Sequence, residues 1–275
     1  MKEGAFFLTL LLIVVPAGVF LAFPGRFYVG RLGAAGWALC GVFGAVQLVA
    51  LSVLLRASFT NPGALRKGTT PSVPAVLQRE VLLGRVPVIC KYCETCKLWR
   101  PPRAAHCSDC GHCVEAFDHH CPWVGACVGR NNYKFFVLFL LVILADCLLA
   151  VGGCLGHIVM LIAVDKDVYV AANAGSIVVL VVASLMSFPV ASLLFYHLSL
   201  IRKGKTTRED FKISEARSPY VRSHACRQVL CGPEYFVAID KRDEEEEEEE
   251  EEEPVKEHAA QEEESDVTDE AALLV

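Results

Sequence analysis

Four long apolar stretches constrain this chain more than any other feature of its sequence. They cover residues 5–23, 32–55, 135–164 and 168–201. A helix needs roughly 20 apolar residues to cross the hydrocarbon of a bilayer, and each stretch is close to or above that length. Because 53% of all residues are hydrophobic, the composition is also typical of a membrane protein. The sequence therefore predicts an α-helical polytopic membrane protein with four transmembrane helices.

The first apolar stretch has a second interpretation, as a cleaved signal peptide. Only Lys2 supplies a basic residue before it, and three further apolar stretches follow, so a membrane span is favoured. We expect Phe23-Pro24-Gly25 to break this helix and to leave Arg26 and Arg31 in a short linker. Thr60-Asn61-Pro62-Gly63 is expected to end the second span.

The distribution of basic residues predicts how the spans are oriented. Residues 56–134 contain eleven Lys and Arg, and residues 202–227 contain eight. The linker after the first span contains two, and the linker at residues 165–167 contains one. Because basic residues in short loops favour the cytosolic side, we expect both termini and the long central loop to be cytosolic. The protein would lie in an endomembrane (Golgi or endoplasmic reticulum) or in the plasma membrane.

The net charge of −6 conceals two opposite parts. Residues 243–275 carry 18 acidic residues and one lysine, so the rest of the chain has a charge of about +11. A basic body beside membrane spans favours anionic lipid headgroups or a phosphorylated ligand over nucleic acid. The glutamate run at residues 244–253 cannot bury enough apolar surface to fold, which predicts a disordered tail. Cys226 and Cys231, close to the last span, are candidates for lipid attachment.

The loop between the second and third spans concentrates the cysteines. Eight of the thirteen lie between residues 90 and 134, in the pattern C-x2-C-x9-H-C-x2-C-x2-C-x4-D-H-H-C-x5-C that begins at Cys93 and ends at Cys127. Two thiolates at C-x2-C spacing can bind one tetrahedral zinc ion. Interleaved histidines indicate reduced, metal-bound thiols rather than disulfides.

Counting ligands separates structural residues from possible catalytic ones. Two four-coordinate zinc sites need eight ligands, and the candidates are Cys93, Cys96, His106, Cys107, Cys110, Cys113, His120 and Cys127. They make two Cys3His sets, which are closed sites that stabilise a fold and cannot activate water. His119 and Cys121 are left over, together with Cys90 and His112.

The leftover residues include the parts of an activated thiol. Cys121 would be the nucleophile, His119 the base that lowers the thiol pKa, and Asp118 the group that orients the base. The alternative is that Asp118 to Cys121 belongs to the ligand run of a non-catalytic zinc-finger adaptor anchored in the membrane. Spacing alone leaves both interpretations open.

Three motifs are similar to those of a known family. They are Asp118-His119-His120-Cys121-Pro122-Trp123, Asn131-Asn132-Tyr133-Lys134-Phe135-Phe136 and Thr206-Thr207-Arg208-Glu209. With the four spans and the cytosolic cysteine-rich loop, the chain resembles the DHHC-type protein S-acyltransferases (palmitoyltransferases). The resemblance implies an enzyme that takes a fatty acyl group, with palmitoyl the expected one, from acyl-CoA as a thioester on Cys121. It would pass the group to cysteines of membrane-associated proteins.

The resemblance also implies roles for individual residues. His119 would be the base, Asp118 would orient it, and Thr207 would contact Asp118. One zinc would be held by Cys93, Cys96, His106 and Cys113, and the other by Cys107, Cys110, His120 and Cys127. Trp123 would lie at the membrane boundary near the acyl chain.

Asp146 in the third span is the residue for which we make a further hypothesis. A carboxylate within a span faces a protein or water interior, because exposure to lipid is costly. Packing against another helix is the alternative role. The resemblance implies an acyl-chain cavity between the spans, and we expect Asp146 to limit how deep the chain can enter.

The chain departs from the family pattern in two places. Asn61 stands where the family usually has aspartate before Pro-Gly. Ser218-Pro219-Tyr220 and residues 225–229 stand where the family has its C-terminal packing motifs, which leaves the docking of that segment open.

The predicted layout combines these observations. It consists of residues 1–57 with two spans and a lumenal linker, 58–89 as a cytosolic linker, 90–134 as the zinc domain, 135–201 with two further spans, 202–242 as a cytosolic segment with the Thr-Thr-x-Glu motif, and 243–275 as the acidic tail.

Overall fold

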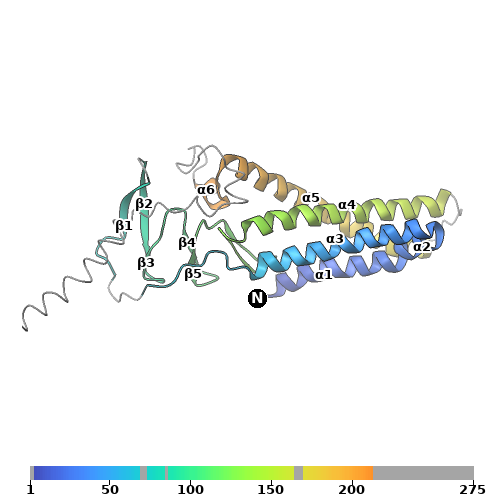
Figure 1. Ribbon diagram of the computed structural model, residues 1–275, viewed down its shortest axis with the longest axis horizontal. Helices are drawn as coiled ribbons and strands as arrows, with labels where there is room; N and C mark the ends of the chain where they lie inside the picture. The colour runs from blue at the N-terminus through green and yellow to red at the C-terminus, as the bar shows by residue number, and fades with distance from the viewer. Residues whose placement is uncertain (1–2, 69–72, 84–85, 164–169, 213–275) are drawn as a thin grey trace, which may run out of the picture.

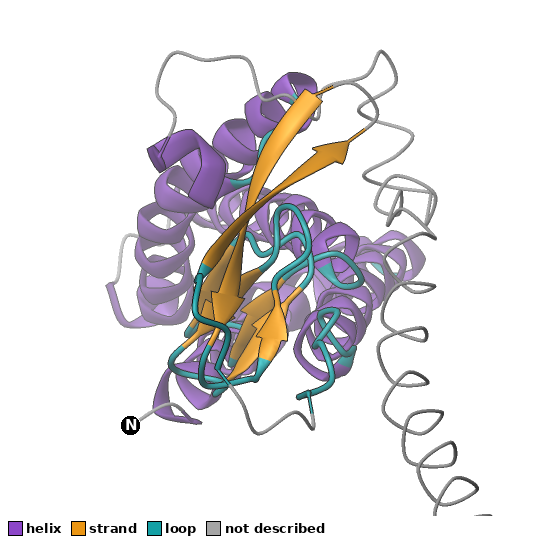
Figure 2. Ribbon diagram, turned by 90° about the vertical axis from the view of Figure 1, so that its left-hand side faces the viewer, coloured by secondary structure: helices purple, strands orange, loops and turns teal. Residues whose placement is uncertain are grey.

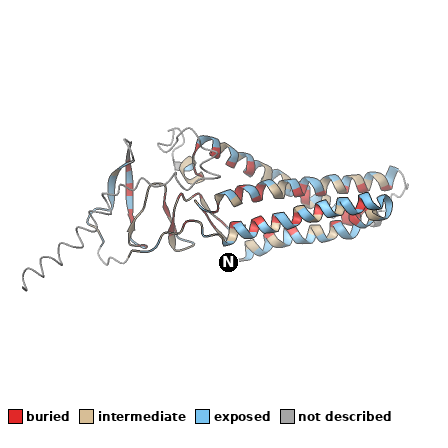
Figure 3. Cartoon of the chain, in the orientation of Figure 1, coloured by how far each residue is buried: buried red, intermediate tan, exposed pale blue. Residues whose placement is uncertain are grey.

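The computed structural model describes residues 3–68, 73–83, 86–163 and 170–212. Long helices lie side by side and form a bundle, and a small domain of short strands continues from one end of it (Figure 1). Four helical segments within the described residues are long and apolar enough to cross a membrane. The predicted four-span helical architecture is confirmed. Exposed positions run along the helices (Figure 3). Many of them are large apolar residues, as a lipid-facing surface requires.

The first span is longer than its sequence indicated. Helix α1 (Glu3–Phe20) continues through a π-helical turn (Leu21–Gly25) into α2 (Arg26–Leu32). The expected break at Phe23-Pro24-Gly25 is therefore wrong, and Arg26 and Arg31 are helical. Pro24 has no N–H group to donate, and the wide π turn accommodates that missing hydrogen bond.

The chain reverses at Gly33 instead, whose φ of 54° is readily adopted only by glycine. The next helix then packs very closely on α2. A Cβ atom at Gly36 would lie 2.1 Å from the carbonyl oxygen of Tyr28. Glycine is required there because the two backbones touch.

Three long helices complete the bundle. They are α3 (Ala34–Phe59), α4 (Tyr133–Ala163) and α5 (Val170–Lys203). α4 packs against both α3 and α5, and α1 packs against α5 and α3. Phe20 of α1 stacks on Phe43 of α3 with ring centroids 4.1 Å apart.

The small domain is built from three short antiparallel units (Figure 2). Its strands are β1 (Gln78–Leu83), β2 (Val86–Cys93), β3 (Leu98–Trp99), β4 (Ala105–Cys107), β5 (His112–Val114), β6 (His119–Cys121) and β7 (Ala126–Val128). β1, β2 and β3 form one sheet, β4 pairs with β5, and β6 pairs with β7. A short helix, α6 (Thr207–Lys212), follows α5.

Asn132 joins the small domain to the bundle. Its side chain is completely buried, and its Nδ2 donates to the carbonyl oxygens of Ala57 and Cys127, each at 2.9 Å. Its Oδ1 accepts from the Gly129 N–H at 2.9 Å. Ala57 lies in the last turn of α3, where carbonyl groups lack helical partners. One side chain thus caps a span and fixes the end of the metal-ligand hairpin.

Asn61 preserves the turn at which the family usually has aspartate. Its Oδ1 accepts from the N–H groups of Gly63 and Ala64, at 3.0 and 2.8 Å. An aspartate oxygen would accept the same two hydrogen bonds, so this substitution changes the charge of the turn and not its geometry.

Several predictions concern residues outside the described part of the chain. They are the acidic tail, the short linker at residues 165–167, the departures at residues 218–220 and 225–229, and Cys226 and Cys231. The domain boundaries also stay predictions.

We expect Asn132→Ala to destabilise the protein, because it leaves two carbonyl groups and one N–H group buried without this partner. Each such group costs about 1–3 kcal/mol. Thermal unfolding in detergent micelles measures the effect. Asn131→Ala is the matched control, because Asn131 is the exposed neighbour. Equal stability of both variants would contradict the role given to Asn132.

Candidate active site and metal centres

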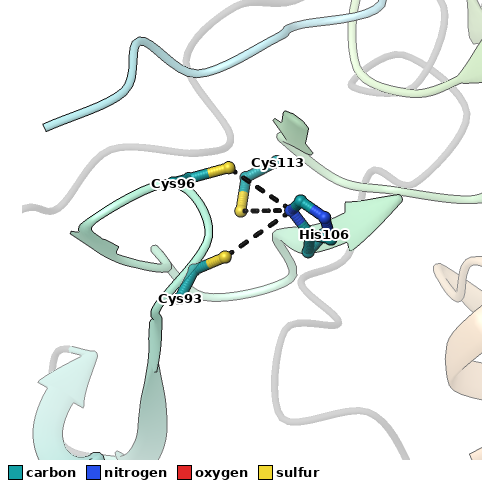
Figure 4. Close-up of side chains that lie close together, drawn as sticks. All are labelled: Cys93, Cys96, His106 and Cys113. Carbon is teal, nitrogen blue, oxygen red and sulfur yellow. Dashed lines mark hydrogen bonds between the residues drawn. The ribbon is translucent and has the colours of Figure 1, made fainter. Parts of the chain in front are cut away.

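The first cluster of metal-ligand side chains lies at the end of β2 and on the β4–β5 hairpin. It contains Cys93, Cys96, His106 and Cys113, whose side chains point toward one another (Figure 4). The Nδ1 atom of His106 lies 3.5, 3.3 and 3.8 Å from the three sulfur atoms, in chain order. His106 and Cys113 face each other across the hairpin, so strand register brings them together.

The second cluster repeats this construction one hairpin later. It contains Cys107, Cys110, His120 and Cys127. The Nδ1 atom of His120 lies 3.8, 3.4 and 3.7 Å from the three sulfur atoms, in chain order. His120 and Cys127 are again cross-strand partners, on β6 and β7. These are the two sets of four that the family resemblance implied.

Both clusters fit zinc. With Zn–S bonds near 2.3 Å and Zn–N bonds near 2.0–2.1 Å, a tetrahedral ion places sulfur and nitrogen about 3.6 Å apart. The N–S distances in both clusters, 3.3–3.8 Å, lie around that value. Because adjacent residues His106 and Cys107 belong to different clusters, the two sites are interlocked through β4.

Cys90 and His112, which the count of zinc ligands left unassigned, belong to neither cluster. Cys90 is buried in β2, three residues before Cys93. The Nδ1 atom of His112 lies 2.9 Å from the carbonyl oxygen of Cys110. Among the described residues, neither belongs to a group of four ligand atoms.

The other leftover residues form a separate constellation at the end of the bundle. Nδ1 of His119 lies 2.7 Å from Oδ2 of Asp118, which is only 2% exposed. The backbone N–H and the hydroxyl of Thr207 donate to the two Asp118 oxygens at 2.9 and 2.6 Å. Cys121 is buried two residues further along β6. The carboxylate is thus fixed from two sides before any substrate arrives.

The electrostatics of this group favour a negatively charged Asp118 beside a positively charged His119. Burial by itself would raise the pKa of the Asp118 carboxyl, but hydrogen bonds from His119 and Thr207 outweigh it and hold that pKa below its ordinary value. Burial by itself would lower the pKa of His119, but its interactions with Asp118 and Cys121 raise it to about 9. His119 is therefore a strong base toward the Cys121 thiol.

Thr207 is held in place by the motif that contains it. Glu209 Oε2 accepts from the N–H of Thr206 at 2.9 Å, and the Thr206 hydroxyl accepts from the N–H of Glu209 at 3.2 Å. This is a capping box at the start of α6. Arg103 of the small domain donates to both Glu209 oxygens at 2.7 Å. A two-point pair of this kind fixes orientation as well as distance.

A cavity of about 550 Å³ opens from Cys121 into the bundle. Near Cys121 its wall includes Trp123 and Phe136, and on α4 the wall continues to Ala150. The rise from Phe136 to Ala150 is about 21 Å at 1.5 Å per residue. The wall is mostly apolar, and α1 is tied to the cavity mouth because Thr9 donates to the carbonyl oxygen of Trp123 at 2.9 Å.

Asp146 lies in the wall of this cavity, together with Gln47 of α3. Gln47 Nε2 donates to the two Asp146 oxygens at 2.8 and 2.9 Å. Asp146 is about 15 Å further along α4 than Phe136. The cavity wall thus carries a polar pair well inside the bundle.

The partners of the candidate residues were not predicted from the sequence. Arg103, Gln47 and His197 were not predicted, and Asn132 appeared only within a motif without a role of its own. All four bridge distant elements. For Gln47 and His197 a signal existed, because each is a polar residue within an apolar stretch. For Arg103 no signal distinguishes it from other basic residues of the loop.

Comparison with known proteins gives consistent results. The family model described as "DHHC palmitoyltransferase" matches residues 89–214. "Palmitoyltransferase ZDHHC14" of Homo sapiens is 34% identical, over 88% of this chain and 55% of that relative. "Palmitoyltransferase ZDHHC9" is 35% identical in Danio rerio and 33% identical in Homo sapiens, over 88% of this chain and 69% and 73% of those relatives. The chain spans about half the length of the ZDHHC14 relatives.

We expect metal content to follow the two clusters. Cys113→Ser and Cys127→Ser should each reduce the bound zinc of the purified protein from about two ions to about one per chain, because each removes one ligand of a closed site. Elemental analysis measures this. Cys90→Ser, in the same segment but outside both clusters, should keep both ions. Loss of metal from Cys90→Ser would contradict the ligand sets.

Proposed function

Because this chain belongs to the DHHC palmitoyltransferase family, we propose that it is a protein S-acyltransferase. It moves a fatty acyl group, principally palmitoyl, from acyl-CoA to cysteines of membrane-associated proteins. One observation carries the proposal. The Cys121 thiol lies at the mouth of a long apolar cavity and beside a histidine that a buried carboxylate orients.

The first half of the reaction loads the enzyme. His119 accepts the proton of the Cys121 thiol, and the thiolate attacks the carbonyl carbon of the acyl-CoA thioester. A new S–C bond forms on Cys121, the bond to the CoA sulfur breaks, and the CoA thiolate takes the proton from His119. The product is an acyl-enzyme thioester, and no redox partner is needed.

The second half transfers the acyl group. His119 accepts the proton of a substrate cysteine, whose thiolate attacks the acyl-enzyme. Cys121 leaves as a thiolate and regains a proton from His119. In both halves Asp118 stabilises the imidazolium and keeps its Nδ1 occupied, so that Nε2 faces the sulfur. Thr207 supports this role by binding the carboxylate from the other side.

The two zinc ions are structural in this proposal. Each has four protein ligands, which leaves no open position for substrate or activated water. Cys121 lies next to the ligand His120 and within the hairpin closed by Cys127. Zinc binding therefore places the nucleophile without taking part in the chemistry.

The fatty acyl chain occupies the cavity. The apolar wall of about 21 Å between Phe136 and Ala150 is on the scale of a long fatty acid and offers it an environment like the bilayer. Trp123 is half exposed at the mouth, where an aromatic ring suits the boundary between lipid and water. The Gln47–Asp146 pair contacts the acyl chain deeper in the cavity than the Cys121 end. Methylene groups that pack against these polar atoms contribute less binding free energy than methylene groups that pack against apolar atoms.

Two arginines near the site are suited to the CoA phosphates. Arg208 follows Thr207 directly. Burial, and then the positive charge of Arg100, lower the pKa of its guanidinium. An anion would stabilise the Arg208 guanidinium in this position, and arginine binds phosphate well.

We propose a cytosolic location for the zinc domain and both termini. The small domain and the N-terminus lie at the same end of the bundle (Figure 1). The basic residues that predict orientation gather in the segments next to that end. The bilayer and membrane-associated proteins are the partners that this placement allows. The basic body does not indicate nucleic acid.

The rival function is a membrane-anchored zinc-finger adaptor without chemistry. It accounts for the two metal clusters and not for the oriented His119 beside a thiol at a cavity mouth. An adaptor would bind zinc and never form a thioester.

The acyl-enzyme gives the decisive test. On incubation with labelled palmitoyl-CoA, the wild type should acquire a label that hydroxylamine removes, and Cys121→Ser should not, while keeping its zinc. Cys147→Ala is the control, because Cys147 is another cysteine in the cavity wall. Full labelling of Cys121→Ser would refute the assignment, and an unlabelled wild type would favour the adaptor.

We expect Asp146→Ala to shift the preference of the enzyme toward longer acyl chains, because it removes a polar barrier and adds space. The ratio of initial acylation rates with 14-, 16- and 18-carbon acyl-CoA should change about two- to tenfold in favour of the longest chain. Leu148→Ala, on the exposed face of α4, should leave the ratio unchanged. An unchanged ratio in Asp146→Ala would exclude Asp146 as a depth limit.

A further inference from the structure

His197 is a buried polar residue that none of the motifs includes. It lies on α5, six residues before the last residue of that helix, and is 1% exposed. A histidine buried in a membrane span is costly unless its nitrogen atoms are bound. Its surroundings therefore indicate what it does.

The His197 ring is surrounded by His119 and by three aromatic side chains, Tyr133, Phe136 and its chain neighbour Tyr196. Tyr133, the first residue of α4, places its hydroxyl 3.0 Å from His197 Nδ1. The ring centroids of His197 and His119 are 5.8 Å apart with an interplanar angle of 37°. The Phe136 ring makes T-shaped contacts with both imidazoles, with centroid distances of 5.1 Å to His119 and 5.0 Å to His197. His197 and Phe136 therefore enclose the ring of the proposed base.

A metal site is the alternative interpretation of this group. One ligand atom each from Asp118, His119 and His197 lies within 4.8 Å of the other two. The Asp118 oxygens and the Nδ1 atom of each histidine already have partners, however. The Asp118 oxygens accept from Thr207 and contact His119, and Nδ1 of His197 contacts the Tyr133 hydroxyl. The group is therefore a hydrogen-bonded network in which a metal would have to displace existing partners.

We propose that His197 is a positioning residue that holds the His119 imidazole turned toward Cys121. Asp118 fixes only one edge of that imidazole, through Nδ1. Rotation about the remaining torsions is blocked by the rings of His197 and Phe136. The hydrogen bond between Tyr133 and His197 holds the His197 ring in the orientation that blocks this rotation, and it links α5 to the first turn of α4.

This inference rests on the proposed function, since it gives His197 a role in the acylation of Cys121. The role concerns the rate of the chemical step and not the binding of acyl-CoA. On α5 the cavity wall extends from Val179 to Leu193, so His197 lies beyond it. Its loss should leave the binding of the acyl chain unaffected and reduce the fraction of time in which His119 faces the thiol.

The test measures the single-turnover rate constant of Cys121 acylation against palmitoyl-CoA concentration, in detergent, with the zinc-loaded chain of residues 1–275. His197→Leu and Tyr133→Phe should each lower the rate constant at saturation about tenfold, the scale of one lost hydrogen bond. The half-saturating concentration of palmitoyl-CoA should not change. His197→Asn, whose amide can still bind the Tyr133 hydroxyl, should recover much of the rate. The double variant should lose less than the product of the two single losses.

His157→Leu is the matched control. His157 is equally deep in the protein at 3% exposure and is hydrogen-bonded to Ser176 at 2.6 Å. It lies about 32 Å from Phe136 along α4. Its loss should destabilise the bundle in a similar way without touching His119, so the acylation rate constant should remain that of the wild type.

The outcomes separate the two proposals. A wild type that never forms the thioester refutes the proposed function. A wild type that does, with His197→Leu and Tyr133→Phe acylated at its rate, overturns only the role of His197. Three further outcomes would overturn the role of His197. The first is that His197→Leu weakens only the binding of acyl-CoA, and the second is that it lowers the acylation rate no more than His157→Leu does. The third is that the wild type binds a third zinc ion that His197→Leu removes. If His197→Leu does not fold, Tyr133→Phe decides alone.

Discussion

The metal-ligand clusters are the constraint on which the rest of the structure depends. The strands that carry them are only two or three residues long beyond β2, and the buried side chains at their centres are largely the ligands themselves. Hydrophobic burial of that size cannot hold a chain in one conformation. A zinc ion held by each cluster would supply the stability that the core does not. The position of Cys121 then follows, because it lies between the ligands His120 and Cys127.

The bundle supplies what the small domain cannot, an apolar volume beside the thiol. The two parts are joined by polar contacts that are buried at their boundary. Asn132 joins α3 to the β6–β7 hairpin, Thr207 joins the segment after α5 to Asp118, and Arg103 joins the small domain to α6. Each contact is satisfied within the protein, as the low dielectric at a membrane boundary requires. Catalysis as proposed requires this boundary to be fixed, since the small domain supplies the base His119 and the helix bundle supplies the cavity.

Much of the fold could be predicted, because membrane spans and zinc sites are recognised from residues that are close together in the sequence. The lengths of the apolar stretches predicted four spans close to the observed ones. The spacing of Cys and His predicted the eight candidate ligand residues, which lie in two clusters in the structure. The prediction was wrong at Phe23-Pro24-Gly25, where a π turn continues the helix. Local propensity favours a break there, but packing of α2 against α3 through Gly36 outweighs it.

The sequence by itself determined the number of spans, the ligand residues and the leftover pair His119 and Cys121, because each of these depends on residues that are near in the chain. Only the tertiary structure decided which groups stand around that pair. Thr207, Tyr133 and His197 reach it from segments far apart in the sequence, and the cavity wall joins residues of α1, α3, α4 and α5. Side chains of this kind carry no local periodicity or spacing, and their roles follow only from the packing of the helices that carry them.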